Sequence, residues 1–184
     1  MKKSALTIAV LAASMAGTAI AATNPTAPTA TSSSGDVQVT IARGDGIMIS
    51  GLADFTFGVQ ATAPVAPISD TVCVYATAGG EYTVTATTAN TGGTAPFDFQ
   101  MADASGSSFI GYQVQYETPT ELPETLVDGV ASGQKTGGDQ ANLDCSGVGG
   151  DNGQITVTVD STTFTAAAVG LPHGDTLTVL VALN

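Results

Sequence analysis

Short stretches in which hydrophobic and polar residues alternate recur along the chain from residue 36 onward. In residues 81–88, Tyr82, Val84 and Ala86 fall on one face, and the threonines between them fall on the other. Strict alternation with many β-branched residues, bounded by Gly, Pro, Asn and Asp, predicts antiparallel strands with one buried face. The stretches with this pattern are 36–42, 46–51, 70–76, 81–88, 109–118, 154–160 and 175–183.

The number and spacing of these stretches predict an all-β fold. So many short strands within about 160 residues indicate an immunoglobulin-like antiparallel β-sandwich, in a single domain over residues 36–184. Residues 22–35 contain no large apolar side chain and are predicted to be a flexible linker of Thr, Pro, Ser and Ala. The glycine-rich residues 128–153 are predicted to form a long surface loop, and residues 161–170 a turn or a single helical turn.

The first 21 residues have the pattern of a secretory signal peptide. Lys2 and Lys3 are followed by an apolar run over residues 5–16, and Ala19 and Ala21 fit a small-residue cleavage site. The run is too short and too rich in alanine to span a bilayer well, and no later segment is apolar enough to do so. We therefore expect a mature chain without membrane insertion, exported to a bacterial periplasm or cell surface.

The strongly negative net charge argues against two classes of binding partner, nucleic acids and anionic membrane surfaces. Without residues 1–21, two strong bases, Arg43 and Lys135, stand against 16 acidic residues, which gives a formal charge of −14. Such a chain repels phosphate backbones and anionic lipid, so neither nucleic acid nor a membrane surface is an expected partner.

The two cysteines predict one structural disulfide. Cys73 lies within a predicted strand, and Cys145 lies in the glycine-rich segment. In an oxidising compartment an isolated pair normally forms a bond, and the C-x-x-C spacing of a redox pair is absent.

Candidate catalytic and metal-binding groups are sparse, and we predict neither an enzyme nor a cofactor. His173 is the single histidine and lies in a predicted tight turn, without a nucleophile motif elsewhere in the chain. A pair of carboxylates that hydrolyses glycosides remains as an alternative, although no two acids stand out. Asp139, Asp144 and Asp151 are weak calcium candidates, but Asp in a glycine-rich segment is more typical of turns than of a metal site.

Several stretches together resemble the exported β-sandwich proteins of the spore coat protein U and archaic chaperone–usher pilin group. They are "ISGLADFTFG" (49–58), "SDTVCVYATAGGEYTVTAT" (69–87), "FIGYQVQYET" (109–118) and "GDTLTVLVALN" (174–184). The resemblance implies a pilin-like sandwich that lacks one strand, which a neighbour's N-terminal segment supplies. It also implies other pilin-like subunits, a periplasmic chaperone and an usher as partners. That group often places a cysteine before the first turn, whereas here the second cysteine is the distant Cys145, so its disulfide geometry does not transfer.

Residues 36–41 are the candidate donor strand. Val37, Val39 and Ile41 alternate with Gln38 and Thr40, whereas residues 22–35 have nothing large to bury. Val37, Val39 and Ile41 are the anchors, the side chains that a neighbour's groove would bury, and a donor strand with three anchors is short.

The tripeptide Arg-Gly-Asp follows the candidate donor at once. Arg43, Gly44, Asp45 and Gly46 separate it from the next strand, and they either close a hairpin or form a hinge. We interpret this tripeptide as that turn or hinge and not as a cell-attachment signal, because a match of three residues arises often by chance.

The predicted function is a structural subunit of a bacterial surface fibre or coat, assembled by donor-strand exchange and supporting adhesion or biofilm formation. The alternative is a monomeric exported binding module, such as an adhesin or a carbohydrate-binding domain with residues 128–153 as its site. An exported enzyme with an unrecognised carboxylate pair is the third class. The first hypothesis needs residues 36–41 outside their own sandwich, and the second needs them paired within it.

Overall fold

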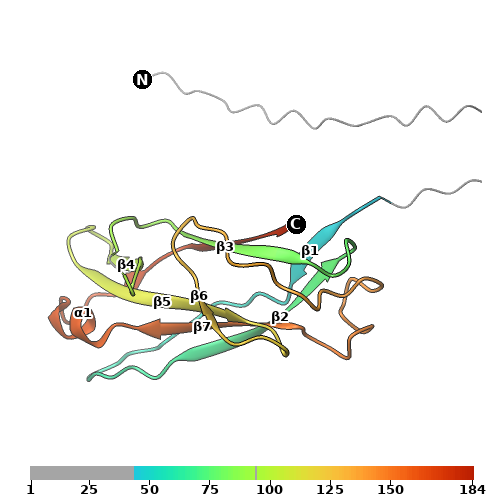
Figure 1. The fold of residues 1–184 in the computed structure, drawn as a ribbon. Helices are drawn as coiled ribbons and strands as arrows, with labels where there is room; N and C mark the ends of the chain where they lie inside the picture. Colours follow the sequence, from blue (N-terminus) through green and yellow to red (C-terminus); the bar gives the residue numbers. More distant parts are fainter. Residues whose placement is uncertain (1–43, 94) are drawn as a thin grey trace, which may run out of the picture. The chain divides into compact units, whose positions relative to one another are not determined.

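Antiparallel strands in two layers form the framework of this computed structural model, which describes residues 44–93 and 95–184 (Figure 1). The larger sheet contains, in spatial order, β1 (Ile47–Ser50), β2 (Ile68–Ala76), β7 (Gly153–Val159), β5 (Phe109–Glu117), β4 (Phe99–Asp103) and β8 (His173–Gly174), and β6 (Glu124–Thr125) pairs with β5. The smaller sheet pairs β3 (Tyr82–Thr88) with β9 (Leu177–Leu183), with Tyr82 opposite Leu183 and Thr88 opposite Leu177. The predicted antiparallel β-sandwich is confirmed.

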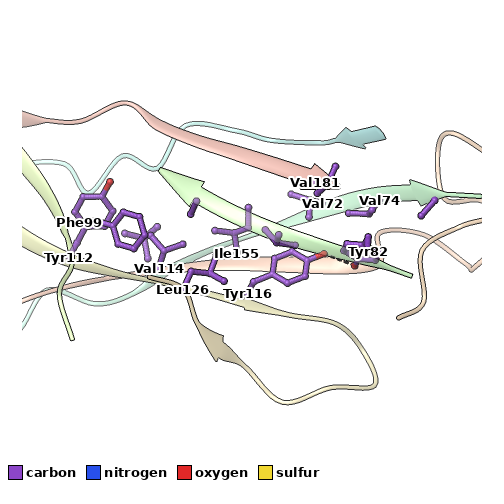
Figure 2. Packing of buried hydrophobic residues seen from close by; sticks show 14 residues of the cluster. Val72, Val74, Tyr82, Phe99, Tyr112, Val114, Tyr116, Leu126, Ile155 and Val181 are labelled. Carbon is purple, nitrogen blue, oxygen red and sulfur yellow. Dashed lines mark hydrogen bonds between the residues drawn. The ribbon is translucent and has the colours of Figure 1, made fainter. Parts of the chain in front are cut away.

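The hydrophobic core lies between the layers, where the alternation predicts it. Tyr82, Val84 and Ala86 of β3 are fully buried and belong to one cluster with the buried Ile155 and Val157 of β7. Figure 2 shows Tyr82 and Ile155 within this cluster. Each fully buried aliphatic side chain contributes about 1.5–3 kcal/mol relative to an exposed one. The alternating hydrophobic residues therefore drive the two sheets together.

Three strands and one helix depart from the sequence-based prediction. Strands β4, β6 and β8 were not predicted, because five residues or fewer are too short for a period-two pattern to stand out. Helix α1 (Ser161–Ala166) is longer than the single turn predicted, since the Asp160 carboxylate accepts hydrogen bonds from the backbone N–H groups of Thr162 and Thr163. Within the described residues, no helix is long and apolar enough to cross a membrane.

The glycine-rich residues 128–153, predicted to form a long surface loop, are irregular and mostly exposed, and part of the segment is hydrogen-bonded to β3. The N–H groups of Gly129, Ser132 and Lys135 donate to the carbonyls of Ala86, Val84 and Tyr82, at 2.9, 2.8 and 2.7 Å. This segment is therefore an irregular cover along the outer edge of β3. The sequence did not predict this pairing with β3, because it depends on the backbone alone and glycines carry no side-chain pattern.

Buried polar contacts fix the second half of the same segment. The side-chain amide of Asn152 donates to the carbonyl of Val74 at 2.8 Å and accepts from its N–H at 2.7 Å. Cys145 is bonded to Cys73, with the two Cα atoms 5.7 Å apart, which confirms the predicted disulfide. Both contacts hold the segment against β2.

The disulfide closes a long loop, since its cysteines are 72 positions apart. Cross-linking a loop of this length is expected to stabilise the domain by about 4 kcal/mol on the chain-entropy model. We predict that replacing both cysteines with alanine lowers the free energy of unfolding by up to that amount, measured by urea denaturation. A loss below about 1 kcal/mol would show that contacts such as those of Asn152 restrain the segment without the bond.

Acid should weaken the turn between β4 and β5. The hydroxyl of Ser105 and the N–H groups of Ser107 and Ser108 donate to the Asp103 carboxylate, and together they lower its pKa to about 2. A lowered pKa in the folded state gives stability that is present above about pH 4 and is lost as the pH falls toward 2. We predict that Asp103→Asn is less stable than the unmodified protein at pH 6 and that the difference shrinks by pH 2, measured by urea denaturation at each pH. Asp54→Asn, on an exposed carboxylate, is the control; an equal pH dependence of both variants would contradict the prediction.

Candidate functional site

Strand β9 has one unpaired edge. On β3, the backbone groups of Tyr82, Val84 and Ala86 form hydrogen bonds with residues 128–138. The backbone groups of the residues between them therefore form the hydrogen bonds with β9. Within the part of the chain that the structure describes, β9 pairs with β3 alone. The backbone N–H and C=O groups of alternate β9 residues therefore point to an open side. The residues concerned are Leu177, Val179, Val181 and Leu183.

A deep groove runs beside the open edge of β9, with a volume of about 1540 Å³. Leu177 and Val179 of β9 line the groove together with residues 52–63, of which Phe55 and Phe57 also pack against the core. The floor comes from the larger sheet across the sandwich. It consists of Met101, Ile110, Tyr112, Ile155, Val157 and Val159. The groove therefore combines exposed backbone groups with an apolar floor, which is what an added strand with alternating side chains requires.

Strand β1 occupies the other end of the space beside β9. Ile47 and Ile49 pack against the same core as Val181 and Leu183, and neither of these β9 residues lines the groove. Val181 is accordingly only 9% exposed. The open part thus runs along the first half of β9, and its length suits a short donor.

Asp175 joins both layers at the start of β9. Its carboxylate accepts from the hydroxyl of Thr88 at 2.6 Å and from the side-chain amide of Asn90 at 3.0 Å, both at the end of β3. It also accepts a hydrogen bond from the hydroxyl of Tyr112, which belongs to β5 in the opposite sheet. These bonds fix where β9 begins, and hence the width of the groove.

The environment of Tyr112 keeps its hydroxyl protonated. Burial raises the pKa of Tyr112, and the hydrogen bond to the negative Asp175 raises it further. Tyr112 therefore acts as a permanent donor between the sheets rather than as an acid or base.

His173 lies at the end of the groove but has no catalytic arrangement around it. Its Nδ1 is 3.0 Å from the carbonyl of Leu171, which can only accept, so Nδ1 carries a proton, and Nε2 lies 2.9 Å from the Ser108 hydroxyl. No carboxylate therefore orients the ring through Nδ1, as a Ser-His-Asp triad would need. The contact ties the β4–β5 turn to the segment before β9.

Residues predicted to form the donor and its connection are placed only in part. Val37, Val39, Ile41 and Arg43 lie outside the described residues. The N–H of Gly46 donates to the hydroxyl of Thr77 at 2.7 Å, and the N–H of Thr77 donates to the carbonyl of Gly46 at 3.1 Å. The chain therefore enters β1 already held to the end of β2.

The three weak calcium candidates use their carboxylates in separate local contacts. Asp139 accepts from the N–H groups of Ala141, Asn142 and Gly147. Asp144 accepts from Ser146 and Asp151 from Thr71. Among the residues that the structure describes, no group of three or more His, Cys, Asp or Glu is placed to hold a metal ion.

The family resemblance implied a sandwich that lacks one strand, but sequence reasoning located neither the groove beside β9 nor Asp175 at its end. The one available signal was the polar "HGD" immediately before an alternating strand, which marks a turn and says nothing of contacts with Thr88 or Tyr112. The open edge of β9 had no sequence signal, because it follows from what covers β3.

No protein-family model and no curated protein matches the sequence. Among solved structures, the fold is similar to that of a chain from a chaperone–tip adhesin complex described as vital for synergistic activation of CFA/I fimbriae biogenesis, with a TM-score of 0.54 and 11% sequence identity. The similarity covers 75% of this chain and 41% of that chain, so this chain spans less than half of its length. At this identity the likeness concerns the fold, an antiparallel β-sandwich that also occurs in a fimbrial complex.

Removing the Tyr112 hydroxyl should loosen the start of β9. Because a hydrogen bond to a charged group is lost while the other donors to Asp175 remain, we predict that Tyr112→Phe lowers the free energy of unfolding by about 1–2 kcal/mol. Amide hydrogen exchange at Thr178 should accelerate, whereas exchange at Thr156 in β7 serves as the internal control. Unchanged exchange at Thr178 would show that Tyr112 does not position β9.

Proposed function

We propose that this protein is a structural subunit of a bacterial surface fibre or coat, in which copies are joined by exchange of a donor strand. The observation that carries the proposal is the unpaired edge of β9 beside the apolar groove. An unpaired strand edge next to an apolar floor is an unstable arrangement in water and favours a further strand. The fold shared with a chain of a fimbrial complex supports the same role.

The donor in this proposal is residues 36–41 of another copy. Val37, Val39 and Ile41 would enter the groove, and the intervening Gln38 and Thr40 would stay at the surface. The open part of the groove runs along Leu177 and Val179, because β1 already covers Val181, so it suits a short donor.

The finer assignment is to the spore coat protein U and archaic chaperone–usher pilin group. It rests on the sequence stretches named above and on the incomplete second layer. On this proposal the subunit is exported by means of residues 1–21, a periplasmic chaperone covers the groove before assembly, and an usher mediates export into the fibre. Adhesion or biofilm formation is then a property of the fibre.

A monomeric binding module with residues 128–153 as its site has less support. That segment runs along β3 and is tied to β2 by Asn152 and the disulfide, so little of it is free to adapt to a ligand.

Strand-joined copies should survive SDS without heat. We predict that full-length protein sheared from the surface of the cells that produce it gives a ladder of oligomers in unheated SDS gels and one band after boiling. Val39→Asp should shorten the ladder, because it places a charge on the apolar floor.

The matched control is Gln38→Asp, which adds the same charge at the neighbouring position and should leave the ladder intact. A single monomer band in both lanes, with cooperative unfolding of the isolated protein, would overturn the fibre proposal and favour a sandwich completed by its own chain.

A further inference from the structure

Among the described residues, no Lys, Arg or His side chain forms an ion pair with the carboxylate at the end of the groove. Asp175 lines the groove, is half-buried, and receives hydrogen bonds only from neutral donors. These donors are the hydroxyls of Thr88 and Tyr112, the amide of Asn90 and the N–H groups of Ala89 and Thr176. Its negative charge is thus solvated by the protein but not neutralised.

The described part of the chain contains one strong base, and it is already used. Lys135 is 4% exposed, and its Nζ lies 2.5 Å from Glu124 and 3.4 Å from Glu121. A cation for Asp175 must therefore come from elsewhere. Without residues 1–21, the one further strong base in the sequence is Arg43, two positions after the last anchor of the candidate donor.

An antiparallel donor brings Arg43 to Asp175. Directly opposed residues of antiparallel strands point to the same face, so anchors that enter the groove must oppose the inward-facing residues of β9. If Val39 lies opposite Val179, each step of two residues along the donor moves the opposed position two residues back along β9. The opposed pairs along the open part of β9 are then Val39–Val179, Ile41–Leu177 and Arg43–Asp175, and Val37 falls opposite Val181, at the end of the groove that β1 covers.

We propose that Arg43 of an incoming copy pairs with Asp175, and that this charge pair sets the orientation and register of the donor strand. The inference rests on the proposed function. It assigns to the Arg-Gly-Asp segment a role in assembly, at the point where the donor leaves the groove.

Other placements of the same donor are worse. The parallel orientation with the same central pair puts Arg43 opposite Leu183 and leaves Asp175 without a cation. An antiparallel slip of two residues one way puts Arg43 opposite Leu177, where burying a charge on an apolar floor is unfavourable. The opposite slip puts Ile41 against the Asp175 carboxylate. The charge pair therefore disfavours the other orientations and registers of the donor as well as stabilising the proposed one.

The lone pairs of Asp175 are already occupied, so the guanidinium would act mainly through its charge. Lys at position 43 should therefore serve nearly as well as Arg. We expect Arg43→Lys to leave the unheated SDS ladder of the full-length protein unchanged. Arg43→Glu should lower the fraction of oligomer about five- to tenfold, the size expected of a partly exposed ion pair replaced by repulsion. The deficit should shrink in assembly at 1 M NaCl, where the Debye length is about 3 Å.

Engineered cysteines test the orientation independently of charge. In a full-length Ile41→Cys/Leu177→Cys variant, the proposed register places the two new cysteines opposite each other, so oxidised oligomers should survive boiling without reductant. In Val37→Cys/Leu177→Cys the oligomers should collapse to monomer on boiling. Both variants must first give the unheated ladder, which shows that the groove still works.

The outcomes separate the inference from the proposed function. A normal ladder that is insensitive to Arg43→Glu, or a boiling-resistant Val37→Cys/Leu177→Cys ladder, would overturn the charge pair while strand exchange stands. Absence of any ladder from the unmodified protein would overturn strand exchange itself.

Discussion

The second layer of the sandwich contains only β3 and β9 in the described residues, and its width decides the rest of the structure. The larger sheet is broader, so apolar side chains of β4, β5 and β7 extend past the last strand above them. Residues 52–63 also line the groove beside β9 but do not fill it. The groove therefore follows from the unequal widths of the two sheets rather than from a particular set of polar residues.

Among the described residues, the smaller sheet is open along β9 and covered along β3. The glycine-rich cover along β3 uses that strand's outer backbone groups, and Asn152, the disulfide and the buried Lys135 hold the cover in place. Within the described residues, every buried side-chain nitrogen and oxygen has a hydrogen-bond partner. A fully satisfied polar network is rigid, so β3 cannot serve as an alternative docking edge. Any added strand is directed to β9.

Much of the fold could be read from local patterns. The alternation in 81–88 and 154–160 identified buried faces that the structure bears out, and two cysteines in an exported chain predicted the bond between Cys73 and Cys145. Strand β4 was not predicted, because a stretch of five residues is too short to show a clear alternating pattern. The pairing of residues 128–138 with β3 was not predicted, because a glycine-rich backbone can join a sheet edge without any side-chain pattern.

The candidate site, like the fold, has features that the sequence alone predicts and features that depend on the tertiary structure. By itself the sequence determined which side chains can alternate into a core and that Val37, Val39 and Ile41 form a short apolar face beside the basic Arg43, because hydrophobicity and spacing are local properties. Tertiary structure alone decided that β9 keeps an open edge and that Asp175 closes the end of the groove. Both depend on hydrogen bonds between segments distant in the chain, such as Lys135 with Tyr82 and Tyr112 with Asp175, and no local pattern encodes such pairings.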